Sequence, residues 1–242
     1  MTALLEIAGI DKHFSGLQAL QDISFAVDEG GVFGIMGANG AGKTTLFNIV
    51  AGALQPDRGA IRFRGADVTG QRPSRLCAAG IARTFQIARP FPDLTVLETV
   101  RIGAFVRERK LGPATRLARA VIERFGLGAK ADAPGRQLTV LERKRLELAR
   151  AYATAPKVLL LDEVAAGLRP AEVEDLVALV RTITAEGVTV LMIEHVLPAI
   201  FALARHVVVL DHGRMIADGT PDEIAADPAV IEAYLGAGYA PA

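Results

Sequence analysis

Hydrophobic residues occur along the chain in short runs that are separated by turn-forming residues. Residues 4–10 and 19–27 are strand-like, and a turn at residues 28–31 leads into a third run that begins at Val32. Residues 158–161 are continuously apolar, as is typical of a parallel strand that is covered on both faces. This pattern predicts an α/β fold.

After the first three apolar runs, the sequence predicts a helix and then further strands. Apolar residues from Leu46 to Leu54 recur at helical spacing, which predicts a helix after the third strand. Residues 60–63 and 81–86 are expected to form short strands, and residues 188–193 form another apolar strand. Strands therefore alternate with helices over much of the chain.

Residues 93–154 differ from this alternation and predict a helical insertion. We expect one helix to begin at Asp93 and an amphipathic helix to cover residues 115–125. Thr139 and Glu142 match the S/T-x-x-E capping box, so a third helix is expected to begin there.

The C-terminal part of the chain reads as a hairpin followed by two short helices. Residues 207–210 and 215–217 are the expected hairpin strands, and residues 222–226 and 228–235 are the expected helices. We therefore expect one domain with an α/β core (residues 1–86 and 155–217), a helical subdomain (residues 87–154) and C-terminal helices with a tail (residues 218–242).

Composition narrows the classes of protein that fit this pattern. The 242 residues are 51% hydrophobic with a formal net charge of zero, which fits a globular chain and argues against a nucleic-acid partner. The single cysteine, Cys77, excludes an internal disulfide and fits a reducing compartment. No apolar run approaches the roughly 20 residues of a membrane span, so any work at a membrane needs a partner that spans it.

The loop after the Val32 strand carries the strongest chemical signal. Gly37, Gly42, Lys43 and Thr44 fit the phosphate-loop pattern G-x-x-x-x-G-K-[ST]. Together with Gly40, the glycines allow backbone N–H groups to surround a polyphosphate, and the following helix directs its positive end at the same anion. Lys43 can neutralise the outer phosphates and the Thr44 hydroxyl can ligate Mg²⁺, so the loop predicts binding of a nucleoside triphosphate.

Carboxylates follow the apolar strand at residues 158–161. Asp162 is placed to hold Mg²⁺ at a phosphate-loop site. Glu163 can orient or deprotonate a water molecule if it lies within hydrogen-bond reach. A lone Asp-Glu pair at a strand end is usually a turn or a helix cap, but the phosphate loop favours the functional interpretation.

Three other residues leave two interpretations open on local sequence alone. Phe14 can stack on a nucleotide base or pack against the core. Gln86, at the end of a predicted strand, can reach a metal or water or can be solvated. His195 can polarise a terminal phosphate or can be a surface residue.

The order of these features resembles the ATP-binding cassette (ABC) family over essentially the whole chain. The resemblance implies a P-loop ATPase core with an N-terminal antiparallel β subdomain and a helical insertion, with ATP and Mg²⁺ bound. It implies that Gln86 couples Mg²⁺ and water to the helical lobe and that Glu163 polarises the attacking water. The other implied roles are a γ-phosphate contact for His195, base stacking for Phe14 and nucleotide contacts for the loop residues Gly37, Asn39, Gly40, Ala41, Gly42, Lys43, Thr44 and Thr45.

Several stretches are similar to the ATPase subunits of branched-chain amino acid importers, among them residues 83–86, 143–150, 165–168, 193–195 and 211–214. This branch implies an importer of branched-chain or other hydrophobic amino acids or small amides. It also implies a heterodimer with a second ATPase (a homodimer is possible in isolation), two membrane permease subunits, a substrate-binding protein and a place on the cytoplasmic face of the inner membrane.

Other classes remain open at this point. A lipid or lipopolysaccharide exporter is one, and a soluble ABC ATPase of translation or DNA repair is another. The latter usually carries two cassettes or a long coiled-coil insertion, and this chain has neither. A P-loop kinase is a third, and it needs an acceptor site. A GTPase needs guanine-reading motifs, and the sequence shows none.

The chain departs from the family pattern in two places. The family signature Leu-Ser-Gly-Gly-Gln aligns with residues 138–142, where Thr139 keeps a hydroxyl but both glycines are replaced. In the family this segment completes the ATP site of the partner, so the partner's site is the one affected. Val164 replaces the usual proline after Glu163. We therefore predict asymmetric hydrolysis that runs mainly at this chain's own phosphate loop.

Overall fold

The computed structural model describes residues 3–84 and 91–235. Its centre is a six-stranded sheet, counted over these residues. In spatial order the strands are β10 (Arg214–Gly219), β9 (Ala204–Asp211), β3 (Val32–Gly37), β8 (Thr189–Ile193), β7 (Val158–Asp162) and β6 (Ile81–Arg83). The strands from β9 to β6 are parallel, and every residue of β3, β7 and β8 is buried. The predicted parallel strands covered on both faces are confirmed.

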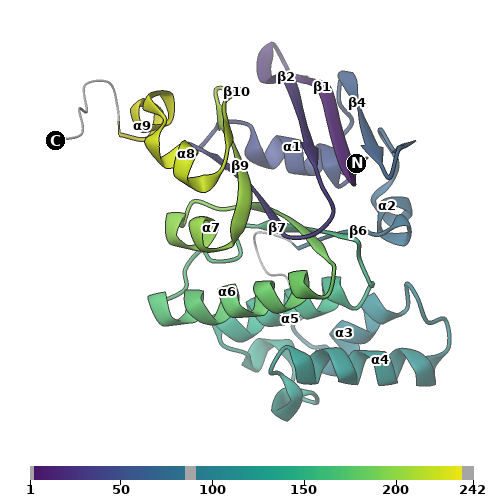
Figure 1. Ribbon diagram of the computed structural model, residues 1–242. Coiled ribbons are helices and arrows are strands. Elements are labelled where there is room, and N and C mark those ends of the chain that lie inside the picture. The colour runs from purple at the N-terminus through teal and green to yellow at the C-terminus, as the bar shows by residue number, and fades with distance from the viewer. Residues whose placement is uncertain (1–2, 85–90, 236–242) are drawn as a thin grey trace.

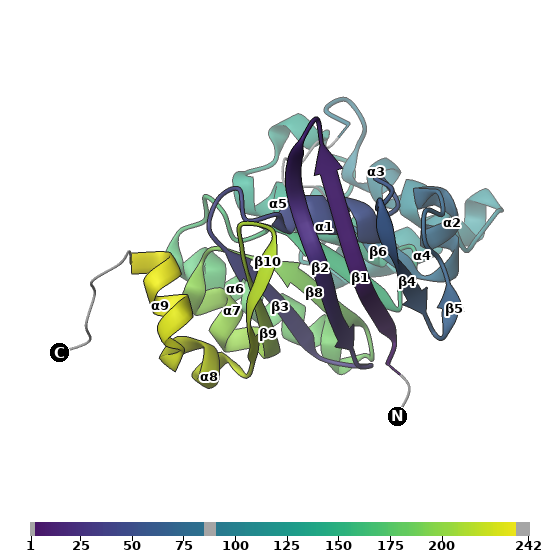
Figure 2. The ribbon, with the colours of Figure 1, turned by 90° about the horizontal axis from the view of Figure 1, so that it is seen from above.

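A second sheet of four strands in the described chain lies above the first and is antiparallel (Figures 1 and 2). Its strands, in spatial order, are β2 (Leu17–Val27), β1 (Leu5–Phe14), β4 (Arg58–Phe63) and β5 (Ala66–Asp67). Helix α1 (Lys43–Val50) lies between the two sheets, and Leu46 and Phe47 pack into the core that the sheets share. The phosphate loop, which joins β3 to α1, is therefore anchored at both ends in buried structure.

Helices cover the opposite face of the six-stranded sheet (Figure 1). These helices are α5 (Val140–Tyr152), α6 (Pro170–Ala185) and α7 (Leu197–Leu203). In α6, Leu176, Val180 and Ile183 recur at helical spacing and are buried against this face. The sheet therefore has a core on each side, and its strand ends remain available for a site.

The helical region packs below these helices in Figure 1 and contains α3 (Val96–Ala104) and α4 (Leu111–Arg124). The predicted start at Asp93 is wrong, because the Thr95 side chain accepts a hydrogen bond from the Glu98 amide (3.1 Å) and caps α3 there. The predicted start of α4 at residue 115 is also wrong. Pro113 lies in the first turn of α4, where a missing N–H does no harm.

Close packing joins α3 to α5. A Cβ atom on Gly103 would lie 2.1 Å from the backbone oxygen of Arg150, so only glycine permits this separation of the helices. Helix α5 begins as predicted, because Thr139 and Glu142 form both hydrogen bonds of the capping box. Short 3₁₀ turns at Gly128–Lys130 and Gly135–Gln137 complete this side of the molecule, while helix α2 (Pro73–Ala79) packs through Leu76 against the core between the two sheets.

The described part of the chain ends with helices α8 (Pro221–Ala226) and α9 (Pro228–Leu235) beside β9 and β10 (Figures 1 and 2). Both predicted helices are confirmed. The β9–β10 hairpin is longer than predicted, because pairing extends as far as Gly219 with Val207. Within the described part of the chain, no helix is both long and apolar enough to cross a membrane.

Candidate functional site

The phosphate loop turns sharply between β3 and α1, and its glycines permit close backbone approach. A Cβ atom on Gly37 would lie 2.3 Å from the Leu210 oxygen, and one on Gly42 would lie 2.7 Å from the Ala19 oxygen. Gly42 has a φ of 102°, in the region that favours glycine, and it precedes the first turn of α1. No acidic residue occupies that turn, so the positive end of the helix is available to an anion.

A cavity of about 530 Å³ opens over this loop. It also extends to the β1–β2 and β9–β10 turns through Leu17, His212 and Gly213, which the sequence did not predict. The predicted site residues that line it are Phe14, Asn39, Gly40, Ala41, Gly42, Lys43, Thr44, Thr45 and Glu163. The structure thus brings the predicted base-stacking ring, the loop and one carboxylate to a single cavity.

The Lys43 ammonium lies within the loop. Its Nζ atom donates hydrogen bonds to the backbone oxygens of Gly37 (2.7 Å) and Ala38 (2.9 Å), and the residue is only 6% exposed. Burial lowers the pKa of Lys43, while the nearby carboxylates of Glu163 and Asp162 act in the opposite direction. A buried ammonium flanked by backbone oxygens is suited to meet phosphate oxygens at close range.

Glu163 follows β7 and His195 lies just beyond β8, so the parallel pairing of these strands brings the two residues to one edge of the sheet. Glu163 has a φ of 47°, and its amide donates to the Ile193 oxygen (2.9 Å). The His195 Nδ1 atom is 3.9 Å from the Glu163 carboxylate, and the ring is half exposed. The two predicted catalytic side chains are therefore neighbours, although His195 is not among the residues that line the cavity.

Asp162 ends β7 and is 1% exposed. Its Oδ2 atom accepts a hydrogen bond from Arg83 Nη2 (2.8 Å), while Arg83 Nη1 donates to the side-chain oxygen of Asn48 (2.6 Å). Its Oδ1 atom is buried and has no hydrogen-bond partner among the described residues. A buried carboxylate oxygen without a partner is costly, so this atom fits a ligand that the described residues do not supply.

Two charged residues that sequence reasoning missed, the partly buried Lys144 and the buried Glu194, support the loop after β7. Lys144, in α5, donates to the backbone oxygen of Glu163 (3.1 Å). Glu194 accepts a hydrogen bond from the Ala165 amide (2.7 Å), and burial raises the pKa of its carboxyl group. These contacts link α5 and β8 to the backbone that carries Glu163. They are long-range contacts, so no local sequence pattern could have revealed them.

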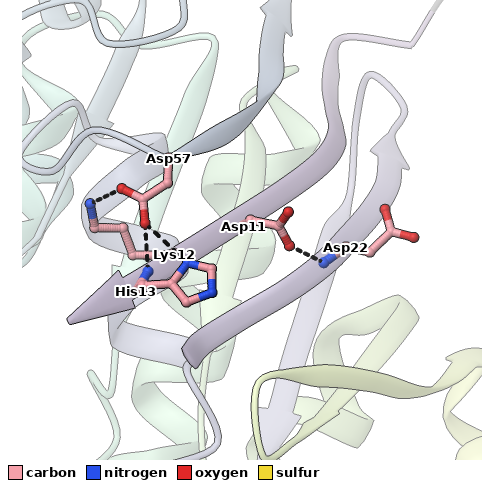
Figure 3. A network of polar contacts seen from close by, with 5 residues as sticks. All are labelled: Asp11, Lys12, His13, Asp22 and Asp57. Atoms are coloured by element: carbon pink, nitrogen blue, oxygen red, sulfur yellow. Dashed lines mark hydrogen bonds and ion pairs between the residues drawn. The ribbon is translucent and has the colours of Figure 1, made fainter. Parts of the chain in front are cut away.

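Phe14 ends β1 and its ring is 44% exposed, so it does not pack in the core. Lys12 and His13, the two residues before Phe14, are both bound by Asp57 (Figure 3). The Asp57 carboxylate accepts hydrogen bonds from Lys12 Nζ (2.7 Å) and from the His13 amide (2.6 Å). The hydrogen bond from Lys12 is the largest cause that lowers the pKa of Asp57 to about 2. In the same figure, Asp11 accepts from the Asp22 amide (2.9 Å), which ties β1 to β2. These hydrogen bonds fix the end of β1 and thereby position the Phe14 ring at the edge of the cavity.

The predicted site residue Gln86 lies outside the described residues. Thr139 caps the exposed N-terminus of α5 and does not line the cavity. Its hydroxyl accepts from the Glu142 amide (3.3 Å), and Glu142 accepts from the Thr139 amide (2.8 Å). Thr139 therefore lies on another surface of the molecule.

A phosphate loop between a parallel strand and a helix, with a buried carboxylate at the end of a neighbouring strand, defines a P-loop nucleoside triphosphatase. The family model described as "ABC transporter" matches residues 20–166. The chain belongs to the ABC transporter family and is one of its ATPase subunits. A second family model, described as "Branched-chain amino acid ATP-binding cassette transporter", matches residues 214–240.

Full-length relatives and solved structures agree with this assignment. The chain is 37% identical to the high-affinity branched-chain amino acid transport ATP-binding protein BraF of Pseudomonas aeruginosa, over 96% of this chain and 98% of the relative. It is 33% identical to LivG of Escherichia coli, of the same description, with the same coverage. A crystal structure of the ADP conformation of MJ1267, an ATP-binding cassette of an ABC transporter, superposes with a TM-score of 0.89 at 32% identity, covering 98% of this chain and all of that one. The crystal structure of a nucleotide-free ATP-binding cassette from an ABC transporter also superposes with a TM-score of 0.89. The two sequences are 31% identical, and the match covers 96% of this chain and 99% of that one.

Proposed function

We propose that this chain is the ATP-hydrolysing subunit of an importer for branched-chain or other hydrophobic amino acids or related small amides. The observation that carries the ATPase part is the cavity in which the phosphate loop, Phe14 and Glu163 meet. The match of residues 214–240 and the full-length similarity to BraF support the class of substrate. The same match does not favour a lipid exporter or a soluble ABC ATPase.

In this proposal the protein supplies mostly positioning and electrostatic stabilisation, as phosphoryl transfer requires. Phe14 stacks on the adenine, while the loop amides and Lys43 hold the phosphates. Glu163 accepts the proton of the water that attacks the γ-phosphate, and His195 contacts that phosphate from the neighbouring strand. The products are ADP and inorganic phosphate.

The residues present fit a magnesium ion at the same site. The buried Asp162 Oδ1 atom has no hydrogen-bond partner in the part of the chain that the structure describes, and Thr44 adds a hydroxyl that lines the cavity. The described residues contain no group of three or more His, Cys, Asp or Glu side chains arranged for a metal, which suits an ion that takes its remaining oxygens from phosphates and water. Thr44, Asp162 (through water) and Gln86 would hold Mg²⁺, which would neutralise charge on the β- and γ-phosphates.

The proposed partners are a second ABC ATPase, two membrane permease subunits and, indirectly, a substrate-binding protein. A groove of about 420 Å³ with a largely apolar lining, to which Phe91, Ile102 and Val106 contribute, supports docking of a permease between the core and residues 87–154, taken as a helical subdomain. The chain would then lie on the cytoplasmic face of the inner membrane. No nucleic-acid partner is proposed.

The signature segment supports unequal ATP sites in the complex. Thr139 presents a hydroxyl at an exposed helix N-terminus, as a partner's phosphate would require. Val140 is also exposed, and its side chain limits backbone approach where the family has glycine. Hydrolysis in the heterodimer would therefore run mainly at this chain's own loop.

The proposal is tested by purifying the tagged chain from gently solubilised native membranes and identifying what accompanies it. Two multi-span proteins and a second cassette are expected, and uptake of labelled leucine should fall in cells that carry Glu163→Gln. A chain recovered alone from the soluble fraction, or with ribosomes or DNA, would contradict the transporter assignment. Unchanged uptake of leucine, isoleucine and valine would contradict the substrate class but not the ATPase.

A further inference from the structure

The C-terminal helix α9 contacts the phosphate loop directly, although the two are distant in sequence. The Gly37 amide donates a hydrogen bond to the Tyr234 hydroxyl (2.7 Å). Figure 2 shows α9 beside the edge of the six-stranded sheet that β9 and β10 form, and α9 packs on β10 and α8. The chain thus returns to the first glycine of the loop just before residue 235.

Gly37 is held from both sides by side chains. Its amide is bound by Tyr234, and its oxygen accepts the 2.7 Å hydrogen bond from Lys43 Nζ. It is also the last residue of β3 and pairs with Leu210 of β9. These contacts therefore fix both peptide groups of Gly37, where the loop leaves strand β3.

Tyr234 is suited to such a role. Its ring is partly buried and packs against the core beneath the sheet, so the hydroxyl has a fixed position. A tyrosine hydroxyl is protonated at neutral pH, and burial raises the pKa of Tyr234 further above its usual value. A protonated hydroxyl accepts the amide hydrogen bond without placing a negative charge beside the phosphates.

We infer that Tyr234 is a positioning residue of the nucleotide site, and that its hydroxyl holds the Gly37 amide so that the loop keeps its phosphate-binding geometry. The inference rests on the proposed binding of ATP at this loop. A loop that leaves this geometry part of the time binds nucleotide more weakly in proportion to the fraction that is competent. By reciprocity, bound nucleotide must stabilise the contact with α9.

The test is Tyr234→Phe in the full chain, which removes one oxygen atom and keeps the ring. Tyr152→Phe is the matched control, because the Tyr152 hydroxyl also forms a hydrogen bond, but to Glu186 and not to the phosphate loop. Loss of one neutral hydrogen bond predicts ADP affinity, by titration calorimetry, weakened about two- to tenfold in Tyr234→Phe. The KM for ATP should rise by a similar factor while kcat stays near wild type, and Tyr152→Phe should leave both unchanged.

Amide hydrogen exchange separates a positioning role from a purely structural one. In the wild-type chain, ADP should slow exchange across residues 228–235, and this protection should shrink in Tyr234→Phe. The inference is overturned if Tyr234→Phe binds ADP as tightly as wild type, or if it differs only in melting temperature. If wild type itself binds neither ATP nor ADP, the proposed function fails instead, so the two failures can be distinguished.

Discussion

The exposed ring of Phe14 allows the base-binding role to be tested with little disturbance of the fold. The ring is 44% exposed, so Phe14→Ala removes few core contacts. Stacking of an aromatic ring on a base contributes about 1–3 kcal/mol when measured by alanine substitution. Because each 1.4 kcal/mol corresponds to a factor of ten, ADP affinity should fall by about 5- to 150-fold. The maximal rate at saturating ATP should change little, since the proposed role of the ring is to bind the base and not to act on the phosphates.

Titration calorimetry with ADP measures this loss directly, and phosphate release at saturating ATP measures the maximal rate. Phe105→Ala is the matched control, because Phe105 is 40% exposed but does not line the cavity. GTP affinity should fall by a similar factor, because stacking makes little distinction between bases. A loss below twofold for ADP, or an equal loss in the Phe105 control, would refute the stacking role.

Three further predictions concern other parts of the molecule. Glu163→Gln should retain ADP binding while phosphate release falls by about 10²–10⁴-fold. In the assembled complex, this substitution should reduce ATP turnover more than the matching substitution in the partner ATPase. Equal losses of turnover would contradict the proposed asymmetry. Gly103→Ala should destabilise the chain by about 1–3 kcal/mol in urea unfolding, because its Cβ would meet the Arg150 oxygen at 2.1 Å; unchanged stability would show that α3 and α5 separate easily. Burial raises the pKa of Glu194 above 4.5, so its protonated form stabilises the fold below about pH 4.5 and that stabilisation is lost as pH rises through the folded pKa. Glu194→Gln keeps the acceptor for Ala165, and its stability relative to wild type should therefore increase with pH; a constant difference would contradict this.

Local signals account for the features that the sequence predicted. The phosphate loop, the apolar β7 strand and the Thr139 capping box each depend on residues that are close in the chain, so short-range patterns suffice. The predicted start of α4 at residue 115 is too late, because Pro113 lies within the helix, and proline is tolerated in a first turn. Helix α6 was not predicted, even though Pro170 at its first position is a start signal.

The missing parts of the site depend on contacts between distant segments. Arg83 reaches Asp162, Lys144 reaches the Glu163 backbone, and Tyr234 reaches Gly37. Each pair forms only when separate elements pack together, so composition and spacing along the chain do not encode it locally. The sequence could therefore predict which residue types bind phosphate, while the residues that hold them in place required the structure.

The backbone of Glu163 implies a compromise between folding and catalysis. A φ of 47° is unfavourable for a residue with a Cβ atom and costs on the order of 1 kcal/mol, which a glycine at the same position would avoid. In the proposed mechanism hydrolysis needs this carboxylate, so it is kept at a cost in stability that the packing of the neighbouring buried strands offsets. Selection for thermal resistance alone would remove the acid from this position, so an inactive, more heat-resistant chain lies one substitution away from the active one.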